Sequence, residues 1–145
     1  MTALFQVSLL LLLIMLAACS RSESSGASAP THPDMGAEEL LATGKTAYAQ
    51  NCATCHYGGR DSKLAPDLIG SAIVNDPDPT ALIRTILHGQ QRVSMVGGKK
   101  FNGIMPPQAY LSDRDIAAIT TYIRQEFSAP PLGVVQPSDV VRLRK

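Results

Sequence analysis

Two cysteines and a histidine form the pattern in this sequence that is best suited to chemistry. Cys52 and Cys55 are separated by two residues, and His56 follows directly. Two thiols at this spacing can each add to a vinyl group of one porphyrin, and the adjacent imidazole can then bind the iron from beneath. The pattern therefore predicts covalent attachment of one haem c, with His56 as an axial ligand of the iron.

The same cysteine spacing also occurs in other kinds of site. A thioredoxin-type dithiol is expected in a βαβ setting, whereas the apolar periodicity of this chain is helical. A zinc site needs two further ligands; no second cysteine pair exists, and the remaining histidines, His32 and His88, stand apart. A structural disulfide across so short a loop is not expected. Haem attachment is therefore the favoured hypothesis, and a redox dithiol is the alternative that stays open.

The surroundings of the motif resemble the class I cytochrome c family. Gly44 and Tyr48 stand eight and four residues before the first cysteine, where the family has a glycine and an aromatic residue on its first helix. The motif is followed by Leu-Ala-Pro-Asp-Leu at residues 64–68, and Gly-Ile-Met-Pro-Pro at residues 103–107 precedes the last predicted helix. The resemblance covers residues 36–128 and implies an all-α fold, with three main helices around one covalently bound haem.

The resemblance also implies roles for residues around the haem. The backbone carbonyl of Pro66 is expected to accept a hydrogen bond from Nδ1 of His56, which leaves Nε2 for the iron, and Leu68 is expected to touch the porphyrin. Met105, which directly precedes two prolines, is the expected second axial ligand, whereas Met95 has no such match. Ligation by histidine and methionine raises the reduction potential and fills the coordination sphere, which favours electron transfer over reaction with oxygen or peroxide.

Three segments have the apolar periodicity of helices. The first covers residues 36–53 and begins with two glutamates, which suit the positive end of a helix dipole. The second is a short core helix between Asp78, a good N-cap, and Gly89, a good C-terminal stop. His88 lies in its last turn, and we interpret it as complementing the dipole rather than as an iron ligand. The third helix begins at Ser112 and ends before two prolines.

Glycine in the middle of a helix costs stability unless another backbone must come close. The resemblance gives this reason for Gly44, because the first and last helices of the family cross there, with Tyr48 and Tyr122 filling the crossing. On the last helix, Arg124 is predicted to face water or a carboxylate. The segments between the helices, residues 57–77 and 90–111, are predicted to be loops that close the two faces of the haem.

The start of the chain predicts export and attachment to a membrane. Residues 1–18 contain no charged side chain and include an almost unbroken apolar run of signal-peptide length. The following Leu-Ala-Ala-Cys-Ser resembles a bacterial lipoprotein box, so cleavage is expected before Cys19 and a lipid on its thiol; an uncleaved anchor is the alternative. Residues 19–35 are small and polar, which predicts a flexible tether. Lipid and haem together account for all three cysteines of the chain.

The last residues of the chain, 129–145, are predicted to be a tail, with two interpretations open. One interpretation is a frayed terminus. The other is a further helical turn, capped by Ser138, that rests Val140 and Val141 on the domain. A similar ending follows the last helix in some cytochromes that serve dehydrogenases, which is a weak indication of the second interpretation.

Charge and composition limit the function. The net charge of +1 produces no strong field, so nucleic acid is not an expected partner. No general acid, base or nucleophile stands near the haem motif, so we expect an electron carrier rather than an enzyme, held by lipid at the periplasmic face of a bacterial membrane between a redox donor and an acceptor. The alternatives are a haem enzyme or gas or peroxide sensor with a labile sixth ligand, and a cytochrome subunit of a dehydrogenase, nitrite reductase or oxidase complex.

Overall fold

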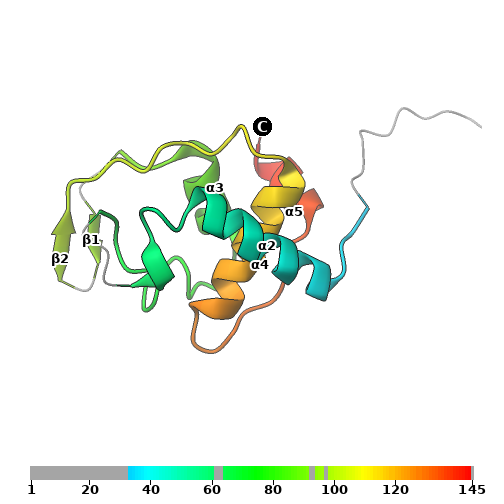
Figure 1. Cartoon of the computed structure of the whole chain (residues 1–145), viewed down its shortest axis with the longest axis horizontal. Coiled ribbons are helices and arrows are strands. Elements are labelled where there is room, and N and C mark those ends of the chain that lie inside the picture. Colours follow the sequence, from blue (N-terminus) through cyan, green and yellow to red (C-terminus); the bar gives the residue numbers. More distant parts are fainter. Residues whose placement is uncertain (1–32, 61–63, 92–93, 97, 145) are drawn as a thin grey trace, which may run out of the picture. The chain divides into compact units, whose positions relative to one another are not determined.

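The computed structural model describes residues 33–60, 64–91, 94–96 and 98–144. In this part of the chain the main elements are the helices α2 (Ala37–Asn51), α3 (Thr80–His88), α4 (Asp113–Glu126) and α5 (Pro137–Leu143) (Figure 1). A single 3₁₀ turn, Tyr57–Gly59, follows α2. The fold is therefore all-α, as predicted, and none of the described helices is long and apolar enough to cross a membrane.

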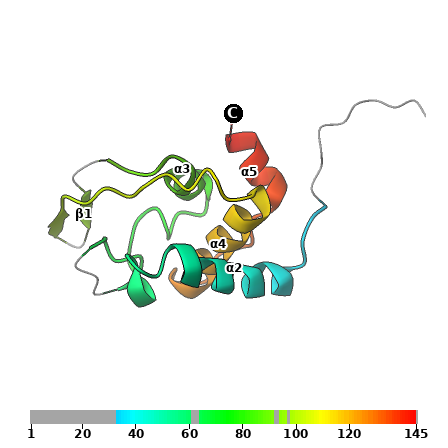
Figure 2. The same cartoon turned by 45° about the horizontal axis from the view of Figure 1, so that its top comes forward.

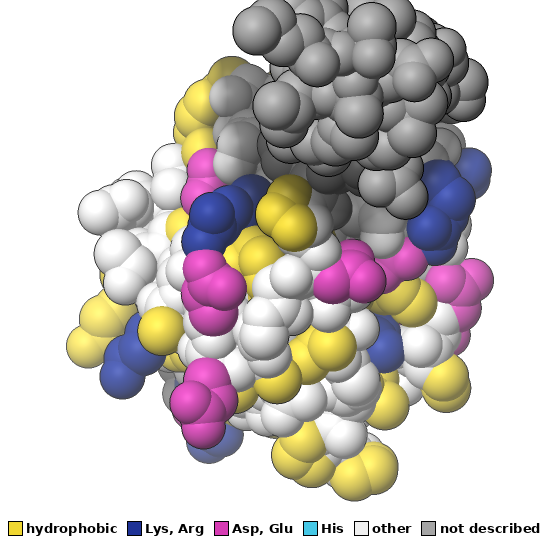
Figure 3. Space-filling model, turned by 90° about the vertical axis from the view of Figure 1, so that its right-hand side faces the viewer, with side chains coloured by type: hydrophobic (Ala, Val, Ile, Leu, Met, Phe, Trp, Pro, Cys, Tyr) yellow, Lys and Arg dark blue, Asp and Glu magenta, His cyan; other side chains and the backbone are white. Residues whose placement is uncertain are grey.

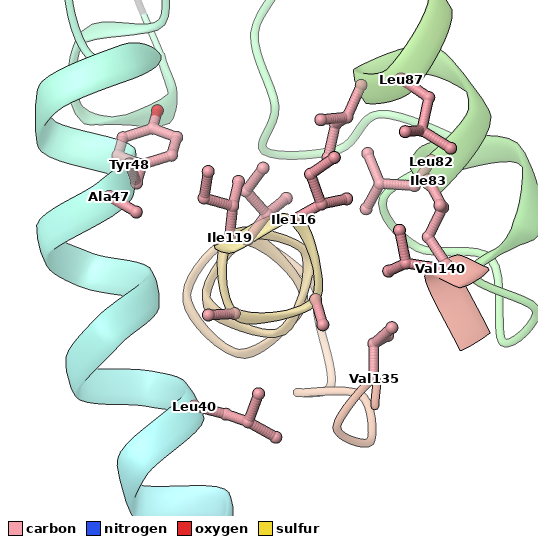
Figure 4. Packing of buried hydrophobic residues seen from close by; sticks show 14 of the residues in the cluster. Leu40, Ala47, Tyr48, Leu82, Ile83, Leu87, Ile116, Ile119, Val135 and Val140 are labelled. Carbon is pink, nitrogen blue, oxygen red and sulfur yellow. The ribbon is translucent and has the colours of Figure 1, made fainter. Parts of the chain in front are cut away.

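Helix α4 lies in the middle of the hydrophobic core. Helix α2 packs on one side of it, and α3 and α5 pack on the other side (Figure 4). The buried side chains at these contacts are mostly leucine, isoleucine and valine, with one tyrosine: Leu40, Tyr48, Leu82, Ile83, Leu87, Ile116, Ile119, Val135 and Val140. The apolar faces predicted for the three main helices are thus the faces that meet in the core.

The crossing of α2 and α4 requires the glycine at position 44. A Cβ atom there would overlap the carbonyl oxygen of Ala118 and lie 2.8 Å from Cβ of Tyr122. Tyr48 and Tyr122 fill the crossing, with ring centroids 5.2 Å apart, and Phe127 joins them at 5.5 Å from Tyr48. The predicted packing role of Gly44 is confirmed, and it explains why the helix tolerates a residue of low helix propensity.

The predicted helix ends are close to the observed ones. Ser112 caps α4: its Oγ accepts a hydrogen bond from the backbone N of Asp115 at 3.1 Å. At the start of α3, the N-cap is Pro79 rather than Asp78, but Asp78 Oδ1 still accepts a hydrogen bond from the backbone N of Thr80 at 3.0 Å. The carboxylate thus satisfies one of the N–H groups that the first turn of a helix leaves without a partner.

The prediction for Arg124 is wrong. Its side chain is buried, with 3% exposure, although it lies on the outer side of α4 as read from the sequence. The guanidinium donates to three backbone carbonyls, those of Asp76 at 2.7 Å, Pro77 at 2.9 Å and Gly133 at 3.4 Å. The segment before α3, remote from Arg124 in the sequence, and the segment that follows α4 both supply carbonyls to this face of the helix, and these carbonyls need a donor.

The C-terminal tail is helical, which decides between the two interpretations. Helix α5 packs on α3 and α4, and both Val135 and Val140 are buried. The N-cap is Gln136 and not Ser138 as predicted, and the carboxylate of Asp139 accepts a hydrogen bond from the backbone N of Gln136 at 2.8 Å. This reciprocal capping arrangement starts the helix two residues earlier than the serine would.

Both ends of the tail are attached to distant parts of the domain. The amide of Gln136 bonds both backbone groups of Met35, at 3.0 Å to its N and 3.1 Å to its O. At the other end, the guanidinium of Arg144 donates to Asp113 Oδ1 at 2.6 Å and to the carbonyl of Leu111 at 2.8 Å. The tail is therefore part of the packed domain.

The segment predicted as a loop before α4 contains a short antiparallel hairpin. Strands β1 (Ser94–Val96) and β2 (Lys99–Phe101) pair with Met95 opposite Lys100. In the two views of Figures 1 and 2 the hairpin lies at the opposite end of the domain from α5. Part of the signal is in the sequence, because an adjacent pair of glycines is typical of a hairpin turn, and Gly98 has φ +76°.

Candidate functional site

The two cysteines and the histidine of the motif belong to one turn at the end of α2. The backbone N of Cys52 still donates to the carbonyl of Tyr48 at 2.8 Å, as the last bond of the helix. The carbonyl of Cys52 then accepts hydrogen bonds from the backbone N of Cys55 at 3.1 Å and of His56 at 2.9 Å. The thiol of Cys52 is half-buried and that of Cys55 is exposed. The turn therefore gathers all three functional groups at one end of the helix.

The ring of His56 is held in one orientation. Its Nδ1 lies 3.2 Å from the carbonyl oxygen of Pro66. Because a carbonyl can only accept, Nδ1 must carry the proton, and Nε2 of the neutral ring retains its lone pair. Burial lowers the pKa of His56, against an opposing effect of the Pro66 carbonyl, so the neutral form is favoured. The backbone of His56 is held as well, since its carbonyl accepts from the hydroxyl of Tyr48 at 2.5 Å.

Gly59 closes the loop that brings Pro66 to His56. This role of Gly59 was not predicted from the sequence. Its carbonyl accepts hydrogen bonds from the backbone N of Leu68 at 2.7 Å and of Ile69 at 3.2 Å, which closes the intervening loop. Gly59 has φ +75°, and a Cβ atom would lie 2.6 Å from the ring of Phe127. Only glycine fits both conditions, and the adjacent pair Gly58-Gly59 was the available signal.

Met105 lies in an extended segment beside the C-terminal end of α3. Its backbone N and O each form a 2.9 Å hydrogen bond with Gln90, and its side chain is half-buried against the core. Gly103, two residues earlier, approaches the loop that carries Pro66, since a Cβ atom there would lie 3.0 Å from the carbonyl oxygen of Leu64. The two predicted loops, residues 57–77 and 90–111, are therefore neighbours at this point.

Large apolar side chains near these residues are exposed. Leu64, before Pro66, is 65% exposed; Ile104, before Met105, is 72% exposed; and Tyr57, after His56, is 79% exposed. Exposed apolar side chains next in sequence to a set of ligating groups are typical of a site that holds an apolar ligand. Thiols, an imidazole with its Nε2 available, a thioether and an apolar surround together fit a haem.

The structure brings some of the predicted site residues together, and it does not describe others. It brings His56 and Pro66 into direct contact, and it places Cys52, Leu68 and Met105 as half-buried residues against the same core. Met95 lies in strand β1, where only its backbone is described. Cys19 and residues 20–32 of the predicted tether lie outside the described residues, so the predicted lipid attachment stays a prediction. The end of the predicted tether is not flexible, because Met35 is buried and bonded to Gln136.

Comparison with known families decides the classification. The family model for cytochrome c matches residues 41–126, which is more than half of the 145 residues and includes the whole site. The chain belongs to the cytochrome c family. Membership confirms the resemblance and the all-α fold, and it implies haem c as the cofactor of this cytochrome.

Several individual proteins are similar to this cytochrome. The cytochrome c subunit of an alcohol dehydrogenase (quinone) from Gluconacetobacter polyoxogenes is 29% identical over 133 residues, covering 77% of this chain and 26% of that subunit. The gluconate 2-dehydrogenase cytochrome c subunit of Pantoea cypripedii is 34% identical over 109 residues, covering 71% and 24%. Cytochrome c6 of Cladophora glomerata is 34% identical over 88 residues, covering 59% and 87%. This cytochrome thus spans about a quarter of the two dehydrogenase subunits.

Proposed function

We propose that this cytochrome is a lipid-anchored periplasmic protein that carries single electrons between redox proteins through one haem c. Cys52 and Cys55 hold the porphyrin by thioethers, and His56 and Met105 are the axial ligands. The observation that carries the proposal is the 3.2 Å contact between Nδ1 of His56 and the carbonyl of Pro66, directly after a cysteine pair of haem-attachment spacing. This contact leaves the lone pair of Nε2 as the one position of the ring that can bind the iron.

The residues of the chain hold and tune the group. When bound, the haem supplies one-electron chemistry, with its iron alternating between the ferrous and ferric states. The carbonyl of Pro66 makes the imidazole more basic, and the thioether of Met105 favours the ferrous state. Because His56 and Met105 would both bind the iron, the chain would leave no ligand position for a substrate, which suits a carrier better than an enzyme.

The proposals of a lipid anchor and of a periplasmic location are supported by the sequence alone. The apolar run of residues 1–18 and the lipoprotein-like box at Cys19 support export and lipid attachment, and the polar residues that follow support a tether. On the face of the domain in Figure 3, basic and acidic side chains are interspersed. Together with the net charge of +1, this mixture favours recognition of partners by short-range contacts over long-range steering.

A second candidate is a permanent cytochrome subunit of a membrane dehydrogenase complex. The favouring observation is that cytochrome subunits of two dehydrogenases match 77% and 71% of this chain. The candidates share their chemistry and differ in the lifetime of the partnership. A tagged full-length chain, solubilised in mild detergent from its natural host, should elute alone if it is a carrier; co-elution with a dehydrogenase at a fixed ratio would favour the subunit.

The spectrum of the full-length holoprotein tests the main proposal. We expect a reduced spectrum typical of thioether-linked haem, one haem per chain by pyridine haemochrome, and no change on addition of carbon monoxide. A shift of the Soret band with the gas would mean a labile sixth ligand and would favour an enzyme or sensor. Absence of any Soret band in protein from a host that matures c-type cytochromes would favour the redox dithiol.

A further inference from the structure

The C-terminal end of α3 touches the backbone that carries Met105. Gly89, the C-cap of α3, has φ +70°. A Cβ atom on this residue would overlap the carbonyl oxygen of Met105 and would lie 2.8 Å from the N of Pro107 and 2.9 Å from the carbonyl carbon of Pro106. All three are backbone atoms, so no side-chain rotation could relieve the overlap. The two segments are in contact only because residue 89 has no side chain.

Hydrogen bonds join the same two segments. In residues 105–108 the two prolines have no N–H, which leaves only those of Met105 and Gln108 as backbone donors. Met105 donates to the carbonyl of Gln90 at 2.9 Å and accepts from its N at 2.9 Å. Gln108 donates at 3.0 Å to the carbonyl of Ile86, in the last turn of α3, where carbonyls have no partner within the helix. Both backbone donors of this segment therefore bond to α3 or to Gln90, the residue after its C-cap.

The side chain of Gln108 adds a link toward the haem-attachment turn. It is buried, with 8% exposure; its Nε2 donates to the carbonyl of Pro106 at 3.1 Å, and its Oε1 accepts from the hydroxyl of Tyr110 at 2.8 Å. That hydroxyl also lies 3.3 Å from Oδ1 of Asn51, the residue before Cys52, and its single proton can be donated to either oxygen. The segment of Met105 thus has the end of α2 as a neighbour, as well as the end of α3.

We propose that Gly89 and Gln108 are positioning residues that clamp the backbone of Met105 and so determine how firmly its thioether is presented to the iron. The inference rests on the proposed function, since it takes Met105 to be the axial ligand. Within the described residues, the backbone of Met95 has a different partner, Lys100 in the hairpin. The clamp therefore acts on one of the two methionines of this region and favours Met105 over Met95.

A methyl group at position 89 should loosen the ligand without touching it. In Gly89→Ala the added Cβ forces the backbone of residues 105–107 away from α3, because overpacking against fixed atoms is relieved only by movement. The matched control is Gly70→Ala. Gly70 also has a positive φ, +76°, so alanine is strained there too, but nothing lies within 4 Å of its Cβ position. An effect that is clearly larger in Gly89→Ala than in Gly70→Ala therefore points to the contact with the methionine segment.

The experiment compares full-length holoproteins of the wild type, Gly89→Ala, Gly70→Ala and Met105→Ala. The first measurement is the ferric charge-transfer band of thioether ligation, and the second is carbon monoxide binding to the ferrous protein. For Gly89→Ala we expect a weakened band and carbon monoxide affinity raised about tenfold, which corresponds to about 1.4 kcal/mol. Gly70→Ala should match the wild type. Equal behaviour of Gly89→Ala and Gly70→Ala would overturn the clamp.

The variants also separate the clamp from the proposal on which it rests. If Met105→Ala retains the band, Met105 is not the ligand and the proposed function needs revision. If Met105→Ala loses the band while Gly89→Ala keeps it, only the clamp is wrong. Should Gly89→Ala give no holoprotein, Gln108→Ala tests the other positioning residue: it adds no atoms, keeps the backbone bond to Ile86 and removes the side-chain bonds to Pro106 and Tyr110. Unchanged carbon monoxide affinity would overturn the role of the Gln108 side chain in the clamp.

Discussion

Arg124 offers the sharpest test of how the domain is held together. It lies on α4 with its guanidinium buried, and it donates to carbonyls from the segment before α3 and from the segment before α5. We consider Arg124→Met, which keeps a long side chain and removes every donor. Three carbonyls in partly buried positions would then lose their hydrogen-bond partner.

The expected cost follows from the number and kind of bonds. A hydrogen bond to a charged group contributes about 1.5–3 kcal/mol, so three would exceed about 4 kcal/mol if nothing opposed them. The guanidinium regains its own hydration when the protein unfolds, however, which reduces the net value of a buried charge. One of the three bonds is long, at 3.4 Å. We therefore expect Arg124→Met to lower the free energy of unfolding by about 2–4 kcal/mol.

The assay is urea unfolding of the holoprotein, followed by far-ultraviolet circular dichroism. The control is Arg114→Met on the same helix, which removes an ion pair with Glu39 whose side chains are 52% and 50% exposed. An exposed pair contributes less than about 1 kcal/mol, so this variant should be nearly neutral. If Arg124→Met costs no more than Arg114→Met, the guanidinium does not hold the two segments and our account of its burial is wrong.

Three further predictions concern the helix crossing, the iron ligand and the anchor. Gly44→Ala should lower the free energy of unfolding by about 1–3 kcal/mol because its methyl meets backbone. Gly36→Ala, with open space around its Cβ but at the N-cap of α2, should cost less than about 1 kcal/mol in the same urea titration; equal costs would contradict the crossing. The ferric charge-transfer band should vanish in Met105→Ala and persist in Met95→Ala, and the reverse would identify Met95 as the ligand. Cys19→Ser should abolish incorporation of labelled palmitate and release the protein from membranes; retention of both would refute the lipid anchor.

Residues whose roles depend on local spacing could be predicted from the sequence. The turn of Cys52, Cys55 and His56 is contained in five consecutive positions, and the cap at Ser112 is contained in four. Gly44 could be interpreted because a glycine inside a helix is costly and therefore needs a reason. The contact of Pro66 with His56 spans only ten residues, and the family resemblance supplied it.

Residues whose roles depend on distant segments could not be predicted in this way. The guanidinium of Arg124 donates to the carbonyls of Asp76 and Pro77, 48 and 47 residues away, and its position on the helix cannot reveal these contacts. Gln136 and Met35, separated by 101 residues, pair through a side-chain amide that has no sequence signature. Gly89 was identified as a helix stop, which is correct, but its contact with Met105 appears only when both segments are in place.

The two sides of the proposed haem site are held by different parts of the core. On the histidine side, Tyr48 packs against Phe127 in the crossing of α2 and α4, and its hydroxyl holds the carbonyl of His56. The same Phe127 ring lies against Gly59, whose carbonyl closes the loop that carries Pro66. The histidine is thus fixed by residues that also pack in the crossing of α2 and α4.

On the methionine side of the proposed site, the segment of Met105 is held by contacts other than the crossing of α2 and α4. The segment of Met105 is attached to the last turn of α3, and Tyr110 can donate its single hydroxyl proton either to Gln108 or to Asn51. Its bonds are few, and two of its four residues are prolines that add no backbone donor. Partial unfolding should therefore release the side chain of Met105 from the iron first. The imidazole of His56 and the covalent links of Cys52 and Cys55 should stay in place. In a urea titration, loss of the charge-transfer band should precede loss of helical circular dichroism; coincident transitions would mean that both ligands are held by one cooperative unit.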